Sequence, residues 1–188
     1  MCADQLNEAL LDIPHRRVGT KLNNNLEIIE STERTTITKT TMASLPTAAE
    51  ILKRFYDAES VYMAAPSGER DFAGGMGKVL SPKVEIHQSP DLPYSQSLYE
   101  GHEGFIKWSE EMAGFFDKLE VTDPQVFERE GADEVVVSSV LKLRTRNGGK
   151  EWEAPLLQTI GVDREKGWLL FIRPFYWNVG GLKEVVGK

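Results

Sequence analysis

The sequence has little cysteine, few basic residues and no long apolar segment. Cys2 is the single cysteine among 188 residues, which excludes an intramolecular disulfide and any Cys-x-x-Cys metal site and is typical of a reducing compartment. No apolar run approaches the roughly 18 residues that a membrane-spanning helix needs, and no apolar stretch follows a basic start as in a secretory signal. We therefore expect a cytoplasmic protein that does not enter a membrane.

The charge balance is acidic. The chain has 22 Lys and Arg against 29 Asp and Glu, a formal net charge of −7. Nucleic-acid-binding proteins need clustered Lys and Arg to neutralise phosphates, so we expect no nucleic-acid partner. The length fits one domain, because domains commonly have about 100–200 residues.

Aromatic residues are absent from the first part of the chain. None of the 17 aromatic residues lies in residues 1–41, and a segment without aromatics buries too little apolar surface to offset its chain entropy. Asp4, Glu8 and Asp12 argue against a mitochondrial transit peptide, since such peptides are poor in acidic residues. We expect a disordered or poorly packed leader over residues 1–45 and one domain over residues 46–188.

Helical patterns come first in this domain. Thr47 followed by Glu50 has the spacing of a capping box, and apolar residues then recur every three or four positions as far as Tyr62. This predicts a helix of about 16–18 residues. We expect a second, short helix over 72–80, weakened by its glycines, and a third that runs from Gly101 to Phe116.

Strand patterns dominate the rest. Residues 83–88 alternate as a strand, residues 89–97 carry two prolines and are predicted to be a loop, and residues 97–100 form a brief strand. Turn residues separate four longer predicted strands, as in hairpins: 118–129, 134–146, 151–162 and 168–177. This order predicts an α+β fold, a cone-shaped half-barrel in which a strongly bent mixed or antiparallel sheet wraps three helices around a cavity.

Several runs resemble the SnoaL-like branch of the nuclear transport factor 2-like superfamily. They are VLSPKVEIHQSPDLPYSQSLYEGHEGFIKWSEEM, GKEWEAPLLQTIGVD and RPFYWN. The resemblance covers about residues 46–180 and implies a cone-shaped barrel with a deep apolar pocket. Members include polyketide cyclases, ketosteroid isomerases and dehydratases that need no metal or organic cofactor. Related cyclases often have Asp after Tyr-Trp, where this chain has Asn178, and this departure weakens a cyclase assignment.

His87 is the first candidate for chemistry. Its imidazole titrates near neutrality, and on the predicted strand it shares a face with Glu85. One interpretation is a general acid or base at the cavity wall, where the resemblance places this position. The other is a histidine that fixes the loop over 89–97. His102 marks a helix entry, and its spacing from His87 matches no compact metal-ligand pattern, so we expect no metal.

Two polar residues interrupt predicted apolar faces. Glu59 lies four positions after Phe55 on the apolar face of the first helix. A carboxylate that faces the cavity would have a raised pKa and could carry a proton; alternatively, it ends that face at the rim. Gln158 lies on an otherwise apolar strand face, and since buried polar groups are hydrogen-bonded, it either meets another side chain or contacts a ligand.

The other candidate substrate-binding residues are mostly aromatic, and aromatic residues at helical spacing also serve as plain core. They are Tyr56, Tyr62, Tyr94, Trp108, Arg173 and Tyr176. Both faces of the last strand are apolar, which indicates a covered sheet. One cover is the helix layer, and the other is a second subunit or the C-terminal tail; we expect a homodimer.

These observations favour a small enzyme without a cofactor. It would move a proton on an apolar carbonyl metabolite, such as a polyketide or terpenoid intermediate, in a cyclisation, isomerisation or dehydration. His87 would carry the proton with help from a carboxylate such as Glu59, while Gln158 and tyrosines hold the enolate oxygen. The alternatives are a non-catalytic binding protein with the same cavity and a dimerisation module.

Overall fold

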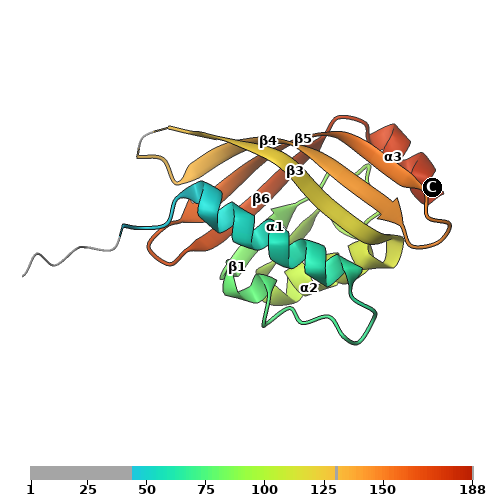
Figure 1. Ribbon diagram of the computed structural model, residues 1–188, viewed down its shortest axis with the longest axis horizontal. Helices are drawn as coiled ribbons and strands as arrows, with labels where there is room; N and C mark the ends of the chain where they lie inside the picture. Colours follow the sequence, from blue (N-terminus) through green and yellow to red (C-terminus); the bar gives the residue numbers. More distant parts are fainter. Residues whose placement is uncertain (1–43, 130, 188) are drawn as a thin grey trace, which may run out of the picture. The chain divides into compact units, whose positions relative to one another are not determined.

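The computed structural model describes residues 44–129 and 131–187 (Figure 1). Cys2 and all but the last two residues of the predicted leader lie outside this part. Helices α1 (Ala48–Ala64), α2 (Gly101–Phe115) and α3 (Val179–Val186) accompany one sheet. Its strands are β1 (Leu80–His87), β2 (Leu98–Glu100), β3 (Phe116–Glu128), β4 (Glu134–Thr145), β5 (Glu151–Asp163) and β6 (Trp168–Tyr176).

The sheet is mixed and open. Its strand order is β2-β1-β6-β5-β4-β3, with β1 parallel to β6 and every other neighbouring pair antiparallel. The strands curve around α1 and α2, which lie on the same side of the sheet (Figure 1). The predicted α+β cone is therefore confirmed.

Local sequence signals account for α1. The Thr47 hydroxyl accepts a hydrogen bond from the Glu50 N–H at 3.2 Å, and the Glu50 carboxylate accepts from the Thr47 N–H at 2.8 Å. These reciprocal bonds satisfy two of the N–H groups left free at a helix start. The residues at helical spacing, from Ile51 to Tyr62, are buried. The capping box and the predicted helix length are confirmed.

The expected helix over 72–80 is reduced to a three-residue 3-10 turn, η1 (Met76–Lys78). Glycine lowers helix stability, and three glycines lie in this segment. The Asp71 carboxylate accepts from the Gly74 N–H at 2.7 Å, which gives the backbone a turn in place of a helix. The third α-helix is instead α3, where the Asn178 side chain accepts from the Gly181 N–H at 2.8 Å.

Strand β6 departs from the predicted alternation near its start. Val162 pairs with Leu169 while the preceding Gly161 pairs with Phe171, so Leu170 is skipped. As a result Leu169 and Ile172 both point into the core, although a regular strand would place them on opposite faces. From Ile172 onward the strand alternates regularly, and Ile172, Pro174 and Tyr176 line the cavity side.

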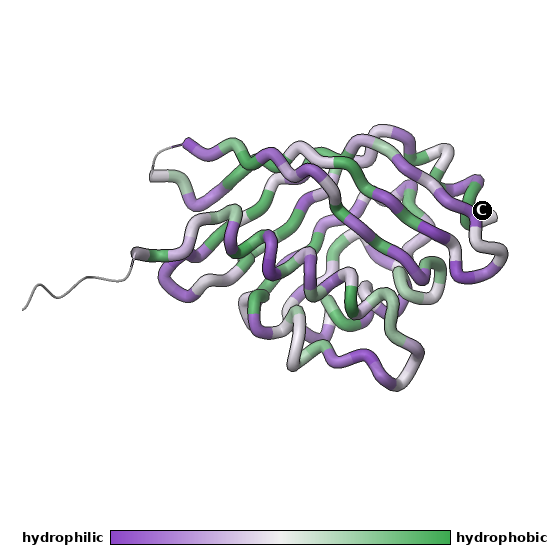
Figure 2. The backbone as a smooth tube through the Cα atoms, viewed as in Figure 1, coloured by the Kyte–Doolittle hydropathy of each residue, from purple (hydrophilic) through white to green (hydrophobic). Residues whose placement is uncertain are grey.

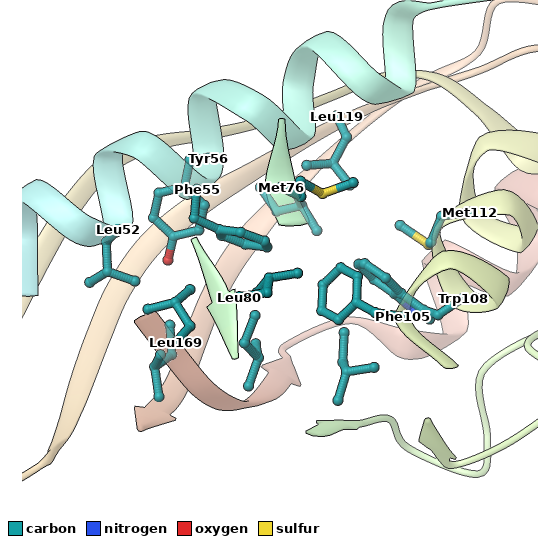
Figure 3. Close-up of a cluster of buried hydrophobic side chains, with 14 of the residues drawn as sticks. Leu52, Phe55, Tyr56, Met76, Leu80, Phe105, Trp108, Met112, Leu119 and Leu169 are labelled. Carbon is teal, nitrogen blue, oxygen red and sulfur yellow. The ribbon is translucent and has the colours of Figure 1, made fainter. Parts of the chain in front are cut away.

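The core fills the space between the helices and the sheet. Figure 3 shows Leu52, Phe55 and Tyr56 of α1 opposite Phe105, Trp108 and Met112 of α2. The ring of Phe105 lies 6.0 Å from that of Phe55 and 5.0 Å from that of Trp108, edge-on in both cases. The hydropathy of the strands alternates along the chain (Figure 2), as expected of a sheet with one buried face.

Arg146, just after β4, joins the ends of both long helices. Its guanidinium donates to the carbonyl of Ala113 at 2.7 Å and to the carbonyls of Met63 and Phe116 at 3.1 Å. The last carbonyls of a helix lack partners within the helix, and a cation suits the negative end of the helix dipole. Arg146 therefore fixes where α1 and α2 end relative to β3.

Candidate functional site

A small cavity lies between α1, α2 and the concave face of the sheet. Its volume is about 30 Å³, room for roughly two water molecules. Most of its lining is aliphatic or aromatic, and the polar groups among it belong to Glu59, Gln88, Trp108, Gln158 and Tyr176. A mainly apolar pocket with a few placed polar groups is typical of small-molecule sites. A larger ligand has to displace flexible lining side chains such as that of Met112.

Glu59 is the most unusual of these residues. Its side chain points inward, as the helical spacing predicted, and it is only 5% exposed. No described residue donates a hydrogen bond to its carboxyl group, and burial raises the pKa of Glu59 to about 8. Asp57, two residues earlier, is exposed and forms an ion pair with Lys53 at 2.7 Å. The same helix thus holds one exposed carboxylate in an ion pair and one buried carboxyl that is neutral over much of the physiological range.

Tyr56 and Gln158 are joined by a hydrogen bond, and Gln158 lines the cavity. The Tyr56 hydroxyl donates to the Gln158 side-chain oxygen at 2.7 Å in a buried hydrogen bond. Burial, with the nearby Glu59 as a smaller cause, raises the pKa of Tyr56 far above its ordinary value, so the hydroxyl stays a donor. Gln158 therefore meets another side chain and also lines the cavity, which combines the two alternatives drawn from the sequence.

Tyr94 and Tyr176 complete the group around Glu59. Burial is the main cause that raises the pKa of both hydroxyls above the ordinary 10.0, and the proximity of Glu59 adds to it in each case. Both phenols thus remain protonated near neutral pH and can donate hydrogen bonds. Glu59 and Tyr176 therefore line one cavity, and the charge of Glu59 also reaches the hydroxyls of Tyr56 and Tyr94.

His87 is not part of this group. Its Nε2 lies 2.9 Å from the Glu85 carboxylate, and its side chain is 34% exposed. The cavity is lined instead by Ile86, on the opposite face of β1, and by Gln88, which directly follows the strand. The predicted placement of His87 at the cavity wall is therefore wrong, because successive side chains of a strand point to opposite faces.

The loop between β1 and β2 is held without His87. The N–H of Gln88 donates to the Ser97 carbonyl at 2.7 Å. From α2, the Glu111 carboxylate accepts from the Ser95 N–H at 2.9 Å, from the Ser95 hydroxyl and from the Tyr99 hydroxyl at 2.8 Å. The alternative role for His87, fixing this loop, has no contact behind it among the described residues.

Four of the predicted substrate-binding residues are not part of the cavity lining: Tyr56, Tyr62, Tyr94 and Arg173. Tyr62 donates to the Glu110 carboxylate at 2.6 Å, in a contact between α1 and α2 outside the cavity lining. The Arg173 guanidinium lies 4.3 Å from the centre of the Phe171 ring, on the outer face of the sheet. Arg173 is therefore stacked on an aromatic ring.

Gln88 is a cavity residue that the sequence analysis missed. It continues the inward set formed by Val84 and Ile86, so the period of two along β1 contained the signal. Its position at the very end of the strand, next to a predicted loop, hid that signal.

Neither a metal site nor a membrane span is found in the part of the chain described. Among residues 44–129 and 131–187, no three His, Cys, Asp or Glu side chains gather as a metal site would require. His102, one of the candidates, instead has its Nε2 3.2 Å from the Leu80 carbonyl oxygen. No helix within those same ranges has the length and apolar character needed to cross a bilayer.

Comparison with known proteins identifies the fold. No family model and no curated protein matches the sequence, whereas solved structures do. One, from Jannaschia sp. CCS1 and named as a SnoaL-like polyketide cyclase, is 19% identical, has a TM-score of 0.55 and is matched over 92% of its length by 74% of this chain. TerC, crystallised with polyporic acid, is 16% identical with a TM-score of 0.58, over 98% of its length and 74% of this chain.

A third structure carries a small ligand. It comes from Catenulispora acidiphila DSM 44928, has a ketosteroid isomerase-like fold and is in complex with trimethylamine. It is 13% identical with a TM-score of 0.52, over 87% of its length and 69% of this chain. These likenesses show that the chain has the nuclear transport factor 2-like fold of the SnoaL-like proteins. One fold hosts many activities, so the site must supply the argument for function.

Proposed function

We propose that this chain, which has the nuclear transport factor 2-like fold of the SnoaL-like proteins, is a cofactor-independent enzyme that transfers a proton on a small apolar carbonyl compound. The observation that carries the proposal is Glu59, a buried carboxyl that has no hydrogen-bond donor among the described residues and lines the same cavity as Tyr176. A pKa of about 8 is close to the value that suits a proton carrier near neutral pH. The reaction class is isomerisation, cyclisation or dehydration.

The chemistry starts from the ionised form of Glu59. Its carboxylate takes a proton from the carbon next to a ketone, and the electrons of that C–H bond form the enolate. The developing oxygen charge is stabilised by hydroxyl donors such as Tyr94 and Tyr176, which act best where water is excluded. Glu59 then returns the proton to another carbon, which isomerises the compound, or to a departing β-hydroxyl group, which dehydrates it.

Apolar surroundings serve this reaction in two ways. The cavity walls from α2 and the sheet favour a hydrocarbon skeleton. They also keep Glu59 poorly hydrated, which makes its carboxylate a stronger base than an exposed one. His87, outside the lining, has no part in this mechanism.

The test compares two carboxylates of one helix. Glu59→Gln should lower the conversion of cyclohex-3-en-1-one to its conjugated isomer, followed by ultraviolet absorbance, by roughly 10²–10⁴. The matched control Asp57→Asn, at an exposed position, should leave the rate unchanged. For the wild type, kcat/KM should rise with pH through about 8, as Glu59 ionises. Full activity in Glu59→Gln would contradict the proposal, and binding of the ketone without any conversion would favour a binding protein.

We also propose that the chain forms a homodimer through the outer face of the sheet. Leu157 and Phe175 lie side by side across β5 and β6 and are 44% and 57% exposed, and the following Trp177 is 85% exposed. Helix α3 leaves these side chains uncovered, and contiguous exposed apolar surface marks interaction sites. Sedimentation of the full chain at micromolar concentration should give a dimer mass. Leu157→Lys with Phe175→Lys should give a monomer of unchanged helix content, and a monomeric wild type would disprove this assembly.

A further inference from the structure

A second hollow, which we call the outer groove, lies at the surface between the loop that joins β1 to β2 and the C-terminal half of α2. Its lining includes Pro93, Tyr94 and Ser95 of the loop and Glu110, Glu111 and Gly114 of α2. The groove has a volume of about 560 Å³, whereas the Glu59 cavity, at about 30 Å³, holds only molecules of the size of water. A ketone therefore reaches Glu59 only if a wall of that cavity moves.

Tyr94 connects the outer groove with the surroundings of Glu59. Its side chain lines the groove and is half-buried, while its hydroxyl oxygen is fully buried. Burial raises the pKa of this hydroxyl, and the nearby Tyr176 and Glu59 add to the rise. Both of these neighbours line the cavity. The side chain of Tyr94 thus extends from the groove to residues of the cavity wall.

The loop that carries Tyr94 is attached to α2 through the carboxylate of Glu111. This carboxylate accepts hydrogen bonds from the Ser95 N–H at 2.9 Å and from the Ser95 hydroxyl, both at an exposed position. Residues 89–97 form turns and bends without a helix or strand. Segments held by few, solvent-exposed hydrogen bonds open more easily than the elements around them. This loop can therefore carry Tyr94 outward while α2 stays packed on the sheet.

Gly114, on the α2 wall of the outer groove, leaves space beside Tyr94. A Cβ atom at this position would meet no atom of the sheet or of the loop within 4 Å. Glycine lowers the stability of a helix, so helix stability does not explain a glycine in the last turn of α2. An open position on this wall is what a passage for a ligand requires.

We propose that Tyr94 is the gate of the Glu59 cavity: ligands enter from the outer groove when the loop over 89–97 moves Tyr94 aside, and Tyr94 thereby limits the size of the compound that reaches Glu59. The kind of ligand, a small ketone, rests on the proposed function. The route rests on the outer groove and on the position of Tyr94.

The first experiment needs no ligand. The indole N–H of Trp108 lines the cavity, is buried and has no hydrogen-bond partner among the described residues, so its exchange with D₂O measures access of water to the cavity. In ¹⁵N–¹H spectra, Tyr94→Ala should speed this exchange by about tenfold or more, because an open form is commonly about 10% or less of the population. Tyr94→Phe, which keeps the ring, is the matched control and should exchange close to the wild-type rate.

The second experiment narrows the outer groove without touching the cavity. Prodan, a fluorescent naphthyl ketone that brightens in apolar surroundings, is mixed with the full chain by stopped flow, and the signal that excess cyclohexanone displaces is followed. Gly114→Leu should slow association and dissociation together and leave Kd nearly unchanged, because it obstructs the path and not the site. Gly114→Ala, with a similar gain in helix propensity, is the matched control and should keep the wild-type rates.

Unchanged Trp108 exchange in Tyr94→Ala, or equal prodan rates in Gly114→Leu and Gly114→Ala, overturns the gate. Should Tyr94→Ala fail to fold, the Gly114 pair still decides, because neither substitution removes a packed side chain. Both readouts are independent of turnover. A wild type that binds no ketone, together with faster Trp108 exchange in Tyr94→Ala, would refute the proposed function and leave the gate standing.

Discussion

Two regions of α1 combine a glutamate with tyrosines, but the glutamate accepts hydrogen bonds in only one of them. In the Arg70 cluster (Tyr62, Arg70 and Glu110), one oxygen of the Glu110 carboxylate accepts from the Tyr62 hydroxyl at 2.6 Å and the other pairs with the Arg70 guanidinium. Arg70 also donates to the Ala65 carbonyl at 3.3 Å. One turn earlier on α1, Glu59 has tyrosines around it and no donor on its carboxyl among the described residues.

The difference separates a structural device from a functional one. In the Arg70 cluster a buried guanidinium and a half-exposed carboxylate are hydrogen-bonded, and such a network fixes neighbouring elements relative to each other. An unsatisfied buried carboxyl lowers stability whenever it ionises, and groups kept at such a cost concentrate at functional sites. The two clusters therefore make different predictions for stability and for activity.

The largest expected effect is the pH dependence that Glu59 imposes on stability. In the unfolded chain Glu59 loses its proton near pH 4.5, whereas the folded chain keeps it up to about pH 8. The folded state binds the extra proton between these values, so the free energy of unfolding should fall as pH rises from about 4.5 to 8 and then level off. Glu59→Gln removes this fall, and at pH 9 its advantage over the wild type should reach as much as about 4 kcal/mol.

Urea unfolding of both proteins at pH 5, 7 and 9 measures this difference. Titration of every other group is common to the two proteins and cancels in the comparison. If the free energies of unfolding of the two proteins change with pH in parallel, Glu59 ionises normally in the folded state despite its burial.

The Arg70 cluster should show a smaller loss without that pH signature. Arg70→Met removes the donor to one Glu110 oxygen and to the Ala65 carbonyl, and should lower the free energy of unfolding by about 1–3 kcal/mol. Lys53→Met, which breaks the exposed ion pair with Asp57, is the matched control and should cost less than about 1 kcal/mol. Equal losses in the two variants would mean that the cluster has no stabilising role beyond a surface ion pair.

The smallest expected effect is the loss of stability when either of two tyrosine hydroxyls on α1 is removed. Tyr56→Phe and Tyr62→Phe each remove one hydroxyl donor and should each cost about 1 kcal/mol in thermal or urea unfolding. Tyr56→Phe also frees the Gln158 side-chain oxygen in the cavity, so it should lower ketone turnover. Tyr62→Phe should leave turnover unchanged, and an equal loss of activity in both variants would contradict the separation of the two clusters.

Local signals in the sequence were sufficient for α1 and for the inward direction of Glu59. The capping box and the helical spacing both act within a few residues, and neither depends on the rest of the fold. The hairpins β3 to β6 were predicted for the same reason, since their turns contain the residues that tight turns require.

The parts that were missed depend on distant residues. Which face of β1 meets the cavity is decided by β6 and the helices, so His87 could not be placed from its own strand. The partner of Gln158 is Tyr56, 102 residues earlier, and no local pattern links them. Helix α3 was missed because two of its first three residues, Gly180 and Gly181, lower helix stability, while the Asn178 cap that starts it is a single side chain.

The parallel pairing of β1 with β6 has a consequence for how the chain is made. Ile86 pairs with Ile172, and β1 joins the rest of the sheet only through β6. During synthesis the ribosome must therefore release nearly the whole domain before β1 has its main partner, while α1 and the β1 strand are already outside the exit tunnel. Pairings that are far apart in sequence form slowly, and unpaired strands in incomplete chains are prone to aggregate. The N-terminal half of this domain therefore stays incompletely paired until the C-terminal half is synthesised. A translational pause before residue 168 would prolong the exposure of the unpaired β1 strand.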